Sequence, residues 1–403
     1  MNYRESIDWL FSTQLFGIKL GLDGPKRLLR QALAYPSHGV KVVHVAGTNG
    51  KGSTCAMVDS VARAVGMRTG LFTSPHLVDF RERIRVSGEE IPEEACAEML
   101  TALRSLCESL DAHPTFFEIT LVLAMQWFRE RECELIVLET GMGGRLDATT
   151  AVPADVCGIT PIGLDHTQWL GETLEEIAVE KAGIMVEGKP VISSPQEPSV
   201  ERVLRMEANE RRSPIHVVSE PLLGYSLGMP GEHQAWNAAL ALECLHALGI
   251  PMNFESVQHG LSSVQWPGRF EVIELDGRIV VFDGAHNPAA AEVLAKTWKA
   301  RFGERRASLV FSAVATKDLA GLGSRLEPLA QEIHLCPVST ERAVMPTELS
   351  EGFAGDAKLH ASAPEAFCAA MQGDGPVLVA GSLFLIGEIK AMLRGDDWRS
   401  TEQ

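Results

Sequence analysis

Two patterns of hydrophobic and polar positions alternate along most of the chain. Short, nearly continuous apolar runs rich in Val and Ile predict buried β-strands; they lie at residues 41–47, 69–74, 134–140, 154–163 and 189–194. Longer segments whose apolar positions recur every three or four residues predict helices; they lie at residues 53–66, 92–110, 116–132, 233–249 and 254–264. Because such strands alternate with helices, we expect a mostly parallel sheet covered on both faces.

The pattern changes near residue 265. Residues 269–288 contain two strand patterns joined by Asp276-Gly277, a strong signal for a two-residue hairpin. Helix and strand patterns then alternate again as far as residue 381. We therefore predict an α/β protein with a P-loop-type, mostly parallel sheet domain over residues 1–264 and a smaller, Rossmann-like α/β domain over residues 265–403. We expect the polar end of the chain, residues 395–403, to be frayed.

Net charge, the lengths of apolar runs and the cysteines limit the kinds of partner and compartment that suit this chain. The 403 residues include 53 Asp and Glu but only 36 Lys and Arg, a formal net charge of −17. This balance argues against a general affinity for nucleic acid or for an anionic membrane. No apolar run approaches the roughly 20 residues that span a bilayer, and the first residues do not form a secretory signal. The eight scattered cysteines form no C-x-x-C pair, so we expect buried free thiols in a reducing cytoplasm.

The segment VVHVAGTNGKGSTC, residues 42–55, has the context of a phosphate-binding loop between a strand and a helix. It departs from the usual P-loop pattern, because Gly52 follows Lys51 where a hydroxyl residue is expected. Flexible glycines, a helix N-terminus and Lys51 would together suit a polyphosphate, and Ser53 or Thr54 could ligate magnesium. The alternative is a plain strand–helix turn with Lys51 in solvent.

Several polar side chains follow other predicted strands, at the sheet edge where ligands bind in open parallel sheets. Glu139 ends one strand, and a carboxylate near a polyphosphate suits Mg²⁺. His166 follows another strand, and Asp283 ends a strand of the second domain. Each has a plain structural alternative, such as a helix cap or a satisfied buried residue. The helix pattern over residues 173–184 indicates only a solvated, acid-rich face that includes Lys181.

Taken together and in order, the motifs resemble those of folylpolyglutamate synthase/dihydrofolate synthase, a family of the Mur ligase superfamily. The matching segments are HVAGTNGKGST, TSPHL, ERIRVSGEEI, FFEIT, ETGMGGRLDATT, ITPIGLDHT, LGETLEEIAVEKAGI, HQAWNAALAL, WPGRFE, DGAHNP and VLVAGSLFLIGEI. Each is weak alone, but the ordered set is highly specific. The resemblance implies the Mur ligase architecture for the two predicted domains.

The resemblance also implies roles for individual residues. The ATP-binding residues would be Asn49, Gly50, Lys51, Gly52, Ser53, Asn237, Arg269 and Asp283. Ser74 and Glu139 would hold one Mg²⁺, and His166 and Lys181 a second, with Lys181 carboxylated on its amine. Lys51, Lys181, His166 and Arg269 would act in catalysis. The pterin substrate would contact Leu20, Gly21, Leu22, Asp23, Phe117, Glu118, Ile119, Thr120, Leu146, Asp147 and Ala148.

The implied reaction is an ATP-dependent amide ligation. A carboxylate of dihydropteroate or a reduced folate would attack the γ-phosphate of ATP, and L-glutamate would attack the resulting acyl phosphate. Neither nucleic acid nor membrane is expected as a partner, and we take the chain as a monomer in the cytoplasm. Alternatives are a muramyl-peptide ligase, which carries a further domain ahead of the loop, and a nucleotide-binding protein that is no ligase. Whether the first glutamate, later ones or both are added stays open.

Overall fold

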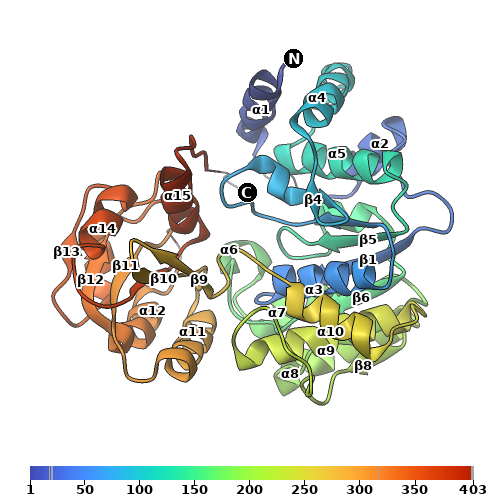
Figure 1. Cartoon of the computed structure of the whole chain (residues 1–403). Coiled ribbons are helices and arrows are strands. Elements are labelled where there is room, and N and C mark those ends of the chain that lie inside the picture. The colour runs from blue at the N-terminus through green and yellow to red at the C-terminus, as the bar shows by residue number, and fades with distance from the viewer. Residues whose placement is uncertain (18, 20, 316, 401–403) are drawn as a thin grey trace.

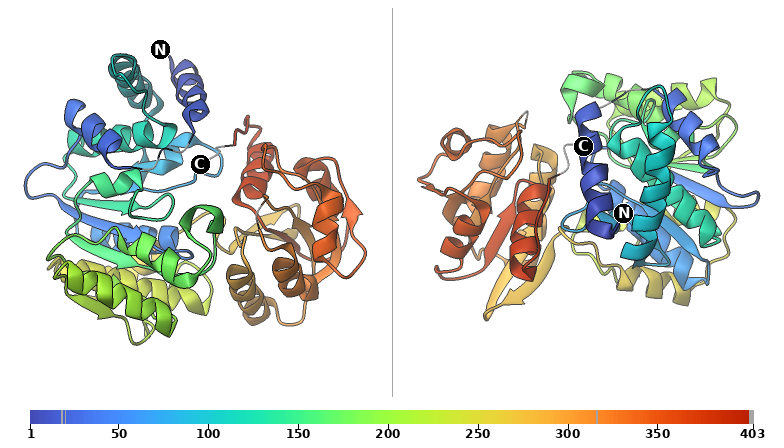
Figure 2. Two further views of the ribbon diagram at one scale, coloured as in Figure 1. Left: turned by 180° about the vertical axis from the view of Figure 1, so that it is seen from behind. Right: turned by 90° about the horizontal axis from the view of Figure 1, so that it is seen from above.

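The chain folds into two α/β units that lie side by side in the computed structural model (Figure 1). The structure describes residues 1–17, 19, 21–315 and 317–400. The N-terminal unit extends from α1 to α10, and the C-terminal unit from β9 to α15. Views from behind and from above show that the two units face each other along one side (Figure 2).

The N-terminal unit is built on an eight-stranded sheet in the order β4-β3-β2-β5-β1-β6-β7-β8. Its strands are β1 (Lys41–Ala46), β2 (Thr69–Phe72), β3 (Ile84–Val86), β4 (Glu89–Glu90), β5 (Leu135–Glu139), β6 (Val156–Ile159), β7 (Val191–Ser193) and β8 (Ile215–Val217). All neighbouring pairs from β2 to β8 are parallel, and β3 and β4 add an antiparallel edge. The predicted parallel sheet is confirmed.

Helices cover both faces of this sheet because both faces are apolar. They are α1 (Tyr3–Ser12), α2 (Asp23–Gln31), α3 (Lys51–Ala64), α4 (Glu93–Glu108), α5 (Phe116–Glu130), α6 (Thr167–Leu170), α7 (Leu174–Ala182), α8 (Pro198–Glu210), α9 (Glu232–Ala247) and α10 (Phe254–Ser263). One hydrophobic core lies under α5 and a second under α3, α9 and α10. No helix among the described residues is long and apolar enough to cross a membrane.

The C-terminal unit has a six-stranded sheet in the order β13-β12-β11-β14-β10-β9. Its strands are β9 (Glu271–Leu275), β10 (Arg278–Asp283), β11 (Ala307–Phe311), β12 (Ala330–Leu335), β13 (Lys358–Leu359) and β14 (Val377–Ala380). Its helices are α11 (Pro288–Phe302), α12 (Leu319–Leu326), α13 (Pro346–Leu349), α14 (Ala363–Ala370) and α15 (Leu383–Arg394). The predicted hairpin is confirmed, because β9 and β10 pair antiparallel and both turn residues have positive φ, 50° for Asp276 and 76° for Gly277.

Two expectations need correction. The end of the chain is not frayed as far as residue 400, since Trp398 donates a hydrogen bond to Leu77 O and Arg399 pairs with Asp8. The sequence pattern could not predict this contact, because it joins residues more than 300 positions apart. Seven of the eight cysteines are buried free thiols, but Cys368 is exposed.

The turn between β1 and α3 depends on Gly47, which has φ 149°. An added Cβ would lie 1.8 Å from Thr160 Oγ1 and 2.9 Å from Thr160 O. We therefore expect Gly47→Ala to lower the free energy of unfolding by about 2 kcal/mol or more, through backbone strain and the clash together. Denaturant unfolding followed by circular dichroism measures this loss.

Gly39→Ala is the matched control, because Gly39 also has positive φ (91°) but nothing lies within 4 Å of the added Cβ. The free energy of unfolding of Gly39→Ala should fall only by the cost of backbone strain at positive φ, about 1 kcal/mol. Equal losses in the two variants would contradict the steric role assigned to Thr160.

Candidate active site

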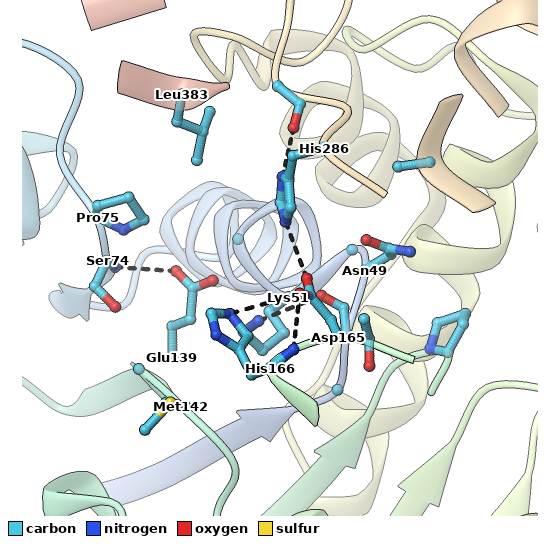
Figure 3. Close-up of a pocket in the computed structure, with 18 of the residues that line it drawn as sticks. Asn49, Lys51, Ser74, Pro75, Glu139, Met142, Asp165, His166, His286 and Leu383 are labelled. Atoms are coloured by element: carbon cyan, nitrogen blue, oxygen red, sulfur yellow. Dashed lines mark hydrogen bonds and ion pairs between the residues drawn. The ribbon is translucent and has the colours of Figure 1, made fainter. Parts of the chain in front are cut away.

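The carboxyl-end edges of the two sheets face one cavity of about 1200 Å³, lined by residues of both units. Every residue that the sequence analysis assigned to ATP, metal or catalysis lines it: Asn49, Gly50, Lys51, Gly52, Ser53, Ser74, Glu139, His166, Lys181, Asn237, Arg269 and Asp283. Figure 3 shows Ser74, Glu139, Lys51 and His166 directed toward the same space. Residues up to 234 positions apart in the sequence, from Asn49 to Asp283, thus share one site.

The loop after β1 has the geometry of a phosphate cradle. Gly50, with φ 91°, ends the loop, and Lys51 is the first residue of α3. The positive end of the helix dipole and the Lys51 ammonium therefore lie together. A side chain at Gly50 would strike Asn237 Oδ1 at 2.7 Å, and one at Gly52 would lie 2.9 Å from Trp266 Nε1. The two glycines are required because Asn237 and Trp266 approach the loop closely.

Glu139 ends β5 with its carboxylate buried against the loop that follows β2. Its Oε2 accepts a hydrogen bond from Ser74 N at 3.2 Å. Burial raises the pKa of Glu139, and the charge of Lys51 and the Ser74 N–H only partly offset this effect. A buried carboxylate whose negative charge is only partly compensated would be stabilised by a divalent cation.

His166 lies beyond β6 in a left-handed conformation, with φ 52° and ψ 36°. The His166 side chain is 45% exposed. Its partial desolvation in the cavity, with the charges of Lys317 and Lys51, lowers the pKa of His166 to about 4, so the imidazole is neutral near pH 7 and can ligate a metal. No three His, Cys, Asp or Glu side chains in the described part of the chain form a metal cluster by themselves. A cation held here would need further donors, such as the Ser74 hydroxyl or phosphate oxygens.

Lys181 is buried at the end of α7, which corrects the interpretation of this helix as a purely solvated face. Its Nζ donates to Gly47 O at 2.8 Å, under the phosphate loop. Burial, with the charge of Lys51, lowers the pKa of Lys181 to about 7. The Lys181 amine therefore loses its proton far more readily than an ordinary lysine, and the neutral amine is nucleophilic.

A second cluster joins the two units, and sequence reasoning did not predict it. Asp165, which follows β6, pairs with two residues of the C-terminal unit. One is His286, whose Nε2 lies 3.2 Å from the carboxylate (Figure 3), and the other is Lys317, through its Nζ. Burial alone would raise the pKa of Asp165, but the hydrogen bond and charges of its two partners hold it well below its usual range. Lys317 follows strand β11, so the strand-end rule could have identified it.

The amides of Asn49 and Asn287 form a second link between the units. Asn49 Nδ2 donates to Asn287 Oδ1 at 3.2 Å, and Asn287 Nδ2 donates to Asn49 Oδ1 at 3.0 Å. Asn287 is also the N-cap of α11, and its Oδ1 accepts a hydrogen bond from Ala290 N. The phosphate loop of one unit is thereby joined to a helix start of the other.

Two charged residues near the start of the C-terminal unit complete the site. The Asp283 carboxylate accepts hydrogen bonds from Phe270 N at 2.8 Å and Ala285 N at 2.9 Å. Burial raises the pKa of Asp283 to about 6, although Arg269 acts in the opposite direction. Arg269 packs against Gly284, where an added Cβ would lie 2.6 Å from the guanidinium.

The residues predicted for the pterin fall into two groups. Phe117, Glu118, Leu146, Asp147 and Ala148 line the cavity. Gly21, Leu22, Asp23, Ile119 and Thr120 do not line it, and Leu20 lies outside the described residues. Ile119 and Thr120 are fully buried because the helical turn of α5 directs them into the core.

Asp165→Asn should strongly destabilise the contact between the units. Removing the charge leaves His286 and Lys317 without their buried carboxylate, a change that costs about 3–5 kcal/mol in comparable pairs. The measurement is a double-mutant cycle of Asp165→Asn and Lys317→Met in denaturant unfolding, where we expect clear non-additivity. Additive losses would contradict the pairing.

The matched control for this cycle is Glu292→Gln, because the Glu292–Lys296 pair is largely exposed, with side-chain exposures of 52% and 72%. Exposed pairs of this kind contribute little to stability because solvent screens them. The control should therefore leave the unfolding midpoint nearly unchanged.

Comparison with known proteins supports this arrangement. The chain matches the family models of the Mur ligase middle domain over residues 45–193 and of the Mur ligase glutamate ligase domain over residues 268–383. It is 34% identical to the dihydrofolate synthase/folylpolyglutamate synthase of Bacillus subtilis over 97% of this chain and 99% of that protein. The Escherichia coli protein of the same name is 35% identical over 87% of this chain and 86% of that protein.

Solved structures agree with these matches. Escherichia coli FolC, solved in complex with DHPP and ADP, is similar with a TM-score of 0.85 and 32% identity over 97% of this chain and 98% of that one. Mycobacterium tuberculosis folylpolyglutamate synthase complexed with ADP is similar with a TM-score of 0.90 and 28% identity over 99% and 100% of the two chains.

A phosphate loop in one α/β unit, facing a second α/β unit across a shared cavity, together with both domain matches, defines the chain as a Mur ligase. Within that superfamily, full-length similarity at more than 30% identity narrows the assignment. The chain belongs to the folylpolyglutamate synthase/dihydrofolate synthase family.

Proposed function

We propose that the chain is an ATP-dependent ligase that joins L-glutamate to the carboxylate of a pteroate or folate through an acyl phosphate. The observation that carries this proposal is the single cavity in which the phosphate loop, a buried carboxylate, a buried lysine and the C-terminal unit meet. Full-length similarity to enzymes named for this activity supports the substrate class. One structure in the family was solved with Mn, AMPPNP and L-glutamate bound.

In this proposal the nucleotide lies between the two units. The loop Asn49–Ser53 receives the phosphates, and Asn237, Arg269 and Asp283 make further contacts to ATP. The buried carboxylate of Glu139 and the neutral imidazole of His166 fit magnesium, together with Ser74 and a carboxylated Lys181. Bound magnesium would neutralise phosphate charge. Two such sites are proposed.

The pterin is assigned to the part of the cavity beside α5. Phe117 offers an aromatic face there and lies 5.7 Å from the ring of Phe72. Asp147 is buried, and its carboxylate accepts Met142 N at 2.9 Å. A buried carboxylate of this kind can accept hydrogen bonds from the amino and ring N–H groups of a pterin.

The chain's own residues contribute position and charge to the reaction. Lys51 and Arg269 stabilise negative charge as the substrate carboxylate attacks the γ-phosphate. Enclosure between the units keeps water from the acyl phosphate until the glutamate amine attacks its carbonyl carbon and phosphate leaves. The Asp165 cluster and the Asn49–Asn287 pair hold the two units together around the reacting groups.

Three further assignments belong to the proposal. The boundary between a domain for ATP and pterin and a domain for glutamate is placed between residues 264 and 265, ahead of β9. We take the enzyme as a monomer with small-molecule substrates only, without nucleic acid or membrane. We also place it in the cytoplasm, in agreement with its buried free thiols.

A product assay tests the function. Purified protein with ATP, Mg²⁺ and L-glutamate is given either dihydropteroate or tetrahydrofolate, and products are identified by mass spectrometry. We expect one added glutamate with dihydropteroate, further glutamates with tetrahydrofolate, or both, each with stoichiometric release of ADP and phosphate. ATP hydrolysis that proceeds equally without pterin and glutamate would reject the ligase.

Lys181 provides a separate test of the metal site. Its neutral amine can attack carbon dioxide, which would convert it into an anionic oxygen ligand. Lys181→Ala should therefore reduce kcat by at least about a hundredfold, as losses of important metal-site residues commonly do. Incorporation of ¹³C-bicarbonate into the wild type, seen by NMR, should be absent from the variant. Full activity of Lys181→Ala would eliminate the carboxylated lysine, and Lys189→Ala serves as a partly exposed control.

A further inference from the structure

The loop that carries Ser74 is anchored in the C-terminal unit, although it belongs to the N-terminal one. Leu77 and Val78, three and four residues after Ser74, are 8% and 9% exposed. Both belong to the hydrophobic core beneath α15, together with Phe282 and Ile386. The position of this loop therefore depends on the packing of the other unit.

Internal hydrogen bonds make the loop a rigid segment. The Glu82 carboxylate accepts the backbone N–H groups of Leu77 at 2.7 Å, Val78 at 3.1 Å and Asp79 at 3.0 Å. Ser74 N, at the start of the loop, donates to Glu139 Oε2 in the cavity. Between Leu77 and Ser74, the ring of His76 is also held, since its Nδ1 accepts a hydrogen bond from Arg83 Nε at 2.8 Å. The position of Leu77 therefore constrains that of Ser74.

The last described residues of the chain pack against this loop. Trp398 Nε1 donates to Leu77 O at 2.9 Å, and the Trp398 ring meets Phe384 edge-on with centroids 6.1 Å apart. Gly387 of α15 leaves room for the contact, because an added Cβ would lie 2.2 Å from Leu77 O and 2.4 Å from Trp398 Nε1. The described end of the chain reaches α1 of the N-terminal unit, where Arg399 pairs with Asp8.

We propose that Trp398 is a positioning residue for Ser74. The indole N–H holds Leu77 O against Gly387, and the rigid loop then holds the Ser74 hydroxyl beside Glu139. Trp398 touches neither substrate nor metal in this assignment, and it acts only through the loop. The inference rests on the proposed function, since it assumes that Ser74 ligates the metal.

The rate of hydrogen exchange at backbone amides of the ligand-free protein tests directly whether Trp398 holds the loop. Trp398→Phe keeps an aromatic ring against Phe384 but removes the N–H donor. We expect the amides of residues 77–79 to exchange about fivefold faster, the change expected for loss of one hydrogen bond of about 1 kcal/mol. The amides of β14, in the core of the C-terminal unit, should be unaffected.

Arg399→Ala is the matched control, because it removes the neighbouring ion pair with Asp8, whose side chains are 41% and 48% exposed. It should leave exchange at residues 77–79 within about twofold of wild type, since exposed pairs contribute little. Unchanged exchange in Trp398→Phe, or an equal increase in both variants, would overturn the positioning role.

Binding of Mn²⁺ with a non-hydrolysable ATP analogue, followed by electron paramagnetic resonance, separates this inference from the proposed function. Trp398→Phe should weaken Mn²⁺ binding about three- to fivefold, and Ser74→Ala should weaken it more, while the melting temperature of Trp398→Phe stays within a few degrees of wild type. If Ser74→Ala binds Mn²⁺ as tightly as wild type, the proposed metal role of Ser74 fails. If only Ser74→Ala weakens binding, that role stands and the positioning role of Trp398 fails.

Discussion

The pairing of the Asp165 carboxylate with Lys317 and His286 fixes how the two halves of the site are placed. Asp165 belongs to one unit and its partners His286 and Lys317 to the other, so the ion pairs form only when the two sheets present their ligand-binding edges to each other. Buried ionic pairs contribute little net stability, but they are very unfavourable when separated in a poorly solvated setting. That asymmetry makes the cluster a strong determinant of how the units are oriented.

A similar balance of charge explains the unusual ionisation within the cavity. Glu139 and Lys181 are both buried and both shifted toward their neutral forms, and Lys51 stands near each of them. A phosphate-binding loop needs positive charge, yet two adjacent ammonium groups repel each other. Conversion of Lys181 to an anion would remove that repulsion and leave Lys51 as the cation facing the phosphates. The placement of the two lysines is thus consistent with a site that becomes fully compensated only when nucleotide and metal are bound.

Much of this could be predicted from the sequence, because it depends on short-range patterns. Val-rich runs predicted the strands, and the rule that ligands gather at strand ends predicted Glu139, His166 and Asp283 as lining residues of the cavity. Lys181 was not predicted in this way. Helical periodicity placed it on a solvated face, and only the family resemblance associated it with metal. Trp398 was missed because its partner Leu77 is 321 positions away. Lys317 follows a strand and could have been identified as a strand-end residue, but its pairing with Asp165, 152 positions away, could not. Contacts at such separations depend on how the two units pack together, and no local pattern encodes that packing.

The docked end of the chain has a mechanical consequence. Apart from the Asp165 cluster and the Asn49–Asn287 pair beside the cavity, the C-terminal unit is joined to the N-terminal unit at two places. One is the covalent connection near residue 265, and the other is the non-covalent contact of Trp398 and Arg399. A unit attached to another at two points can still rotate about the line through both attachments. Rotation about other axes and sliding past the other unit are resisted. Any opening of the cavity should therefore be a rotation of the C-terminal unit about this one axis. The same rotation in reverse returns the two units to the same closed arrangement.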